Sequence, residues 1–172
     1  MSTVRGNPDF EYELAIRQNN VRRLNTLKRQ QVPPCRSALL YALKQKRENL
    51  IPTLLAAGAD PNEVDGYGQT ALGFATQYRD ADAVKLLLEG GADPNQDALL
   101  CKPLTVAATW EKADTVRLLL RHGANPNGRD YSGLTALHQA KEYGYVEIIK
   151  LLRAAGAVAL FEGKRRDDYP DA

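Results

Sequence analysis

The chain has 172 residues, of which 44% are hydrophobic and 26% are charged, so it is long and apolar enough to form a domain with a sizeable core and is not a disordered tail protein. Its 23 Lys and Arg residues nearly balance 21 Asp and Glu residues, and the net charge of +2 gives no general attraction to nucleic acid or membranes. Two cysteines and two histidines form neither a disulfide framework nor a four-thiolate zinc site. The first thirty residues lack a signal-peptide apolar run, and no later stretch reaches 18 apolar residues, which predicts a soluble, cytoplasmic protein without membrane contact.

The first predicted unit spans residues 8–34, after an N-terminal extension of residues 1–7. Its Ala15, Val21, Leu24 and Leu27 match the small and apolar positions of the units that follow. Prolines follow Val32 directly, so the second helix of this unit ends there. We expect this unit to be a degenerate N-terminal cap whose connecting loop is shortened.

Four further units follow at residues 35–62, 63–95, 96–127 and 128–161. Each has a helix-start residue, a small residue five positions later, an amphipathic run typical of a second helix, and a glycine 21 positions after the start. A glycine there suits a left-handed helix cap. The start residues are Ser37, Thr70, Lys102 and Thr135; the small residues are Ala42, Ala75, Ala107 and Ala140; and the glycines are Gly58, Gly91, Gly123 and Gly156.

The start segments carry a recognisable motif. Thr135-Ala136-Leu137-His138-Gln139-Ala140 resembles the Thr-Pro-Leu-His-x-Ala signature of the ankyrin repeat, which recurs about every 33 residues. Thr70-Ala71-Leu72-Gly73-Phe74-Ala75 has Gly in place of His. The resemblance implies an all-α ankyrin-repeat solenoid of stacked helix-turn-helix pairs with hairpin fingers, forming a single domain over residues 8–161. The polar residues 162–172 are expected to form a flexible tail.

The sequence offers little for catalysis. The resemblance implies that the imidazole of His138 bonds to the neighbouring finger and orders it, and His122 should be solvated at a helix end. Cys35 and Cys101 have no motif that would lower a thiol pKa, so we expect ordinary free thiols. No phosphate-binding glycine loop is present. We expect no enzyme activity, no cofactor and no metal site.

The resemblance implies protein binding through the finger tips and the concave face of the first helices. Seven and eight residues after three of the start residues lie Gln77-Tyr78, Thr109-Trp110 and Glu142-Tyr143, which align three aromatic side chains. These rings either bind a partner as anchors or fill the rim of the packed groove. The predicted partner-binding residues are Tyr78, Trp110, Tyr143, Gln77, Thr109, Glu142, Tyr67, Gln69, Leu99 and Tyr131.

The middle finger departs from the pattern. It is one residue shorter than its neighbours and carries the apolar Leu99 and Leu100. We expect an irregular finger in which these leucines either fold back or form an exposed anchor.

Residues 17–47 contain nine basic and no acidic residues, so an unopposed basic patch is predicted at the N-terminal end of the solenoid. It is either a solvated cap surface or a site for an acidic protein; nucleic acid is disfavoured because no aromatic residues are interleaved. A further alternative is that the protein, a monomer, inhibits a partner enzyme or toxin. The patch comprises Arg17, Arg22, Arg23, Lys28, Arg29, Arg36, Lys44, Lys46 and Arg47.

Overall fold

The computed structural model describes residues 8–78, 81–98 and 102–158, and this part of the chain is helical. Leu99, Leu100, Cys101, the extension 1–7 and the tail 162–172 lie outside the described residues. The helices are α1 (Pro8–Arg17), α2 (Val21–Arg29), α3 (Ala38–Lys44), the 3-10 helix η1 (Glu48–Leu50), α4 (Ile51–Ala56), α5 (Ala71–Tyr78), α6 (Ala81–Glu89), α7 (Pro103–Thr109), α8 (Ala113–Arg121), α9 (Ala136–Glu142) and α10 (Val146–Ala154).

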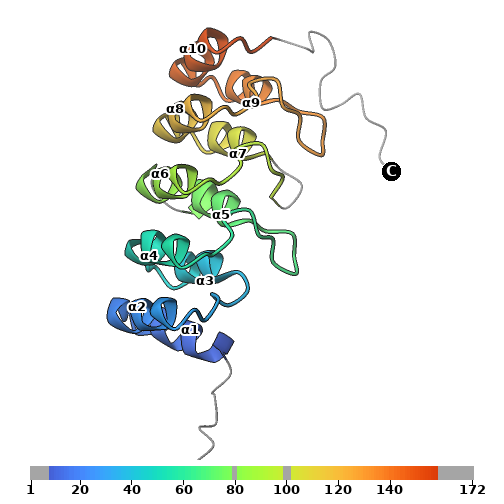
Figure 1. Cartoon of the computed structure of the whole chain (residues 1–172). Coiled ribbons are helices and arrows are strands. Elements are labelled where there is room, and N and C mark those ends of the chain that lie inside the picture. The colour runs from blue at the N-terminus through green and yellow to red at the C-terminus, as the bar shows by residue number, and fades with distance from the viewer. Residues whose placement is uncertain (1–7, 79–80, 99–101, 159–172) are drawn as a thin grey trace, which may run out of the picture.

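The helices form five antiparallel pairs stacked in chain order (Figure 1). Odd-numbered helices contact the next odd-numbered helix, and even-numbered helices contact the next even-numbered helix, so the stack has two columns. The long connections between pairs project beyond the odd-numbered column as fingers (Figure 1). The predicted all-α solenoid is confirmed.

Local sequence explains where the helices begin and end. The hydroxyl oxygens of Thr70 and Thr135 accept hydrogen bonds from the backbone N–H groups of Gly73 (3.0 Å) and His138 (3.2 Å), which caps α5 and α9. The glycines that follow α4, α6, α8 and α10 have φ between +86° and +95°, the left-handed conformation expected of helix caps.

The core is built from residues that recur at the same place in each pair. Leu54, Leu87, Leu119 and Leu152 lie 17 residues after the four start residues, and all four are fully buried. Burying each leucine contributes about 2 kcal/mol. The small alanines five residues after the starts are also fully buried, which lets adjacent helices approach closely.

An asparagine ladder, formed by Asn62, Asn95 and Asn127, joins successive pairs. Each amide Nδ2 donates to the carbonyl of the helix-capping glycine in the next pair, at 3.0 to 3.2 Å. Each Oδ1 accepts a backbone N–H two residues beyond that glycine, at 2.7 to 2.9 Å. The ladder therefore repeats one pair of bonds across three successive interfaces.

The N-terminal pair is closed differently. The hydroxyl of Tyr12 in α1 is fully buried and donates to the carbonyl oxygen of Val32 at 2.8 Å. Residues 30–37 connect α2 to α3 through turns. The β-bridges of the described chain lie elsewhere, in residues 64–70 and 129–135, so this connection lacks the hairpin of those two fingers.

Among the described residues, no helix combines the length and apolarity needed to cross a membrane.

Candidate partner-binding groove

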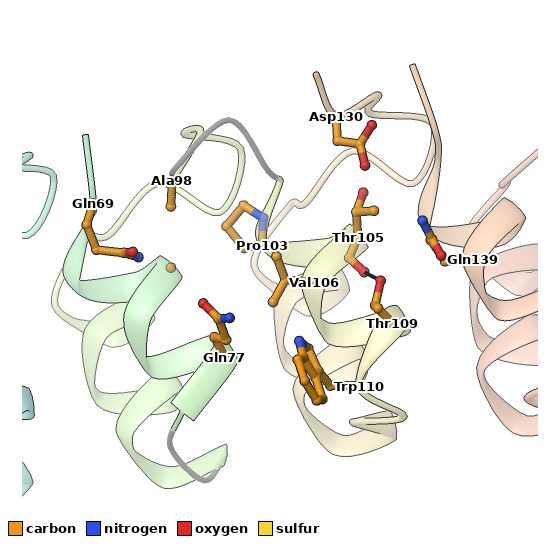
Figure 2. A pocket seen from close by; sticks show the side chains of 11 residues that line it. Gln69, Gln77, Ala98, Pro103, Thr105, Val106, Thr109, Trp110, Asp130 and Gln139 are labelled. Carbon is orange, nitrogen blue, oxygen red and sulfur yellow. Dashed lines mark hydrogen bonds between the residues drawn. The ribbon is translucent and has the colours of Figure 1, made fainter. Parts of the chain in front are cut away.

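A groove of about 320 Å³ opens on the odd-numbered column, between α5 and α7 and reaching the start of α9 (Figure 2). Its floor and walls include Gln77 of α5, Val106 and Trp110 of α7, and Gln139 of α9. Gly73 contributes no side chain, and Ala98 from the next finger occupies that space: a Cβ added at Gly73 would overlap the Ala98 methyl group. The glycine at a position where the family signature has His therefore shapes this end of the groove.

The three aligned aromatic residues lie where the helices of this column end. Tyr78 is the last residue of α5, and Trp110 and Tyr143 are the residues that cap α7 and α9. Their exposed fractions are 56%, 58% and 53%. The ring of Tyr78 lies 4.9 Å from that of Phe74, and Tyr143 stacks on Tyr145 at 5.6 Å. The tyrosines are thus held by a neighbouring ring while more than half of each surface faces solvent.

A lysine fixes the relative positions of the two helix ends at the groove. The ammonium group of Lys112, in the turn after Trp110, donates to the carbonyl oxygens of Thr76 (2.7 Å) and Gln77 (2.9 Å). These carbonyls end α5, where a cation also interacts favourably with the helix dipole. Sequence reasoning missed this contact. The sequence signal that could have indicated it is the basic residue ten positions after the start residue, which is Lys112 in the fourth pair and Arg47 in the second.

The groove wall combines satisfied and unsatisfied polar groups. Gln69, predicted to be an exposed finger contact, is only 6% exposed, and its amide lies against the Thr70 carbonyl at 3.5 Å, so it lines the wall rather than presenting a surface. The Thr109 hydroxyl donates to the carbonyl of Thr105 at 2.9 Å. The hydroxyl of Thr105 is itself buried without a hydrogen-bond partner in the described chain.

Two amides and an indole remain available at the groove. The side chains of Gln77 and Gln139 and the indole N–H of Trp110 make no hydrogen bond to another described residue. Figure 2 shows the two glutamines on opposite sides of α7, with Trp110 below. The groove therefore offers hydrogen-bond donors beside an aromatic surface.

The tips of the fingers at residues 64–70 and 129–135 are strongly exposed. Tyr67 and Tyr131 occupy equivalent turns and are 84% and 80% exposed. Asp65 organises the first turn: its Oδ1 accepts the backbone N–H groups of Tyr67 (2.9 Å) and Gln69 (3.0 Å). Burial raises the pKa of Asp65, but these bonds and the Lys44 ammonium at 3.2 Å outweigh it, so the pKa lies below its usual value.

The basic patch is partly neutralised, so the expectation of nine unopposed cations is wrong for three of them. Carboxylates from outside residues 17–47 pair with these cations: Arg23 with Glu11 at 2.7 Å, Arg36 with Glu63 at 3.2 Å, and Lys44 with Asp65 at 3.2 Å. The guanidinium of Arg17 donates to the hydroxyl of Tyr41. Arg22, Lys28, Arg29 and Lys46 are exposed and form no ion pair with another described residue.

The histidines and the described cysteine have structural surroundings. The imidazole of His138 approaches Glu142 one turn along α9, at 4.0 Å, and makes no bond to a finger in the described chain, which corrects the expected role. His122 caps α8 and is exposed, as predicted. Cys35 is buried, and burial together with Glu13 and Asp9 raises the pKa of its thiol to about 12.

Comparison with known proteins agrees with the repeats seen in the structure. The family model described as "Ankyrin repeats (3 copies)" matches residues 12–98 and 96–159. No curated protein matches the chain. Ankyrin repeats are generally protein–protein interaction modules and are typically non-catalytic. With its stacked pairs, capping glycines and this match over most of its length, the chain belongs to the ankyrin repeat family.

Proposed function

We propose that this protein is a non-catalytic module that binds a partner protein through the groove and the neighbouring fingers. The observation that carries the proposal is the alignment of Tyr78, Trp110 and Tyr143, each more than half exposed, at the ends of three successive helices of the column on which the groove opens. Trp110 also lines the groove itself. Exposed Tyr and Trp side chains of this kind are frequent anchors at protein interfaces.

Rigidity supports the same conclusion. Lys112 fixes the end of α5 against the turn after α7, and neighbouring rings hold the two tyrosines. Side chains that are already ordered lose less conformational entropy when a partner binds. Tyr67 and Tyr131 would extend the contact along the fingers.

The test is affinity capture from the native cell extract with the wild type and a Trp110→Ala/Tyr143→Ala double variant. Removal of two anchors should weaken a partner by about 4 kcal/mol, which eliminates capture at micromolar bait. Phe10→Ala is the matched control because Phe10 is an equally exposed aromatic residue at the far end of the stack. If the double variant retains the partner but melts at a lower temperature than the wild type, both rings contribute to packing and not to binding.

The basic patch supports a second candidate function, binding of an acidic protein at the first two helix pairs. Arg22, Lys28, Arg29 and Lys46 are exposed and lack carboxylate partners among the described residues. Such binding would weaken steeply as salt rises, and an Arg22→Glu/Lys28→Glu variant would lose it. Capture that is insensitive to both changes would eliminate this candidate.

A further inference from the structure

The spacing of the aligned aromatic residues carries information about the shape of the partner. Tyr78, Trp110 and Tyr143 lie at the same position of three successive pairs, and packed helices are about 8–10 Å apart. A polyproline II helix has three residues per turn and a rise of 3.1 Å, so one face repeats about every 9.3 Å. In a β-strand the same face recurs about every 6.7 Å, which does not match the spacing of the pairs.

Hydrogen bonding matches the same backbone. A polyproline II segment makes no internal hydrogen bonds, so its carbonyl groups are open to donors. Gln77, Gln139 and the indole of Trp110 offer N–H donors that no other described residue uses. Aromatic surfaces combined with donors are the features by which proline-rich segments are recognised in aromatic-lined grooves.

Charge along the column distinguishes the two ends of the segment. Nine residues after the start, the second pair has Lys46 and the fourth has Glu111; both are exposed and lie in equivalent turns with φ near +55°. Glu142 adds a second exposed carboxylate in the fifth pair. Lys141 precedes it but lies about 100° away around α9. A complementary segment is acidic toward α3 and basic toward α9.

We propose that a proline-rich polyproline II segment of the partner binds along the odd-numbered column and across the groove, with prolines three residues apart against Tyr78, Trp110 and Tyr143 and a basic residue at the end near Glu142. The inference rests on the proposed function, because it names the class of partner for the same groove. Two steps between pairs span about 16–20 Å, which corresponds to about six residues of polyproline II.

The chain carries its own probe, because Trp110 is its one tryptophan. The full protein is titrated with a capped peptide of eight prolines that carries glutamate at one end and arginine at the other, while the fluorescence of Trp110 is followed. A second peptide has alanines in place of the prolines, and a third has glutamate at both ends. We expect saturable binding of the first peptide and at least tenfold weaker binding of the other two.

Protein variants locate the binding. Tyr143→Ala keeps the fluorescent probe and should weaken the proline peptide at least tenfold, whereas Phe10→Ala should leave its affinity unchanged; circular dichroism verifies that both fold. Equal binding of the alanine peptide would show that the prolines are not recognised and would overturn the inference. Equal binding of the doubly acidic peptide would overturn its basic end. If the Trp110→Ala/Tyr143→Ala variant loses the native partner but the wild type does not bind the proline peptide, this inference alone is refuted. If the same variant retains the native partner, the proposed function is refuted.

Discussion

Asn95→Ala removes the middle rung of the asparagine ladder. In the structure its Nδ2 donates to the carbonyl of Gly123 at 3.0 Å and its Oδ1 accepts the N–H of Asn125 at 2.7 Å. Each such bond contributes about 0.5–1.5 kcal/mol net. Because Asn95 is only half-buried and water can replace part of the loss, we expect the free energy of unfolding to fall by about 1–2 kcal/mol.

For a chain of this length a loss of that size lowers the melting temperature by roughly 2–8 °C. The position of the rung adds a second effect. A repeat protein is stabilised by interfaces between neighbours, so a weakened central interface reduces cooperativity between the two halves. Urea unfolding followed by circular dichroism should show a lower midpoint and a shallower transition.

Asn127→Ala is the matched control, since Asn127 makes the same two bonds to Gly156 and Val158 in the final pair. Its loss frees only the end of the described stack, so a smaller decrease in stability and an unchanged slope are expected. The reasoning is refuted if Asn95→Ala changes stability by less than about 0.5 kcal/mol, or if the two variants behave alike.

Three further outcomes follow from the structure. Gly73→Ala places a methyl group against Ala98, so it should destabilise the protein by about 1–3 kcal/mol in urea unfolding. An unchanged urea midpoint would show that the finger carrying Ala98 moves aside without a loss of stability. Because the pKa of Asp65 is lower in the folded than in the unfolded protein, its carboxylate stabilises the fold above the unfolded pKa, and this stability is lost as pH falls through the folded pKa. Asp65→Asn should therefore flatten the loss of thermal stability on acidification. An unaltered pH profile of the melting temperature would contradict the role of the Asp65 hydrogen bonds. Cys35, with its thiol pKa raised to about 12, should resist iodoacetamide at pH 8 until urea unfolds the chain, as peptide mapping would show; rapid native modification would contradict its burial.

The periodicity of the sequence predicted the stacked helix pairs because each repeat has similar residues at its helix start, its core positions and its helix cap. The start residues, the fully buried alanines and leucines, and the left-handed glycines all act within one helix pair or against its direct neighbour. Their positions in the structure match the positions read from the sequence. The degenerate first unit also forms a helix pair, α1 and α2.

The contacts that could not be predicted join different repeats through single side chains. Lys112 reaches back to the end of α5, and Glu63 binds both Arg36 and the backbone N–H of Ser37. Neither pairing recurs regularly along the chain: the other cation at the position of Lys112 is Arg47 of the second pair, and the later repeats have no carboxylate at the position of Glu63. For the same reason the sequence suggested an unopposed basic patch: carboxylates on α1 and on the first finger reach it only after folding.

The last rung of the ladder also bears on deamidation at Asn127. Asn127 precedes Gly128, a pair that deamidates readily when the glycine nitrogen can attack the asparagine side-chain carbonyl. Here the Gly128 N–H donates to the carbonyl of Asn125 at 3.0 Å, and both ends of the Asn127 amide are held. Succinimide formation requires these bonds to break together, so the rate at which Asn127 loses ammonia records how often the last rung opens.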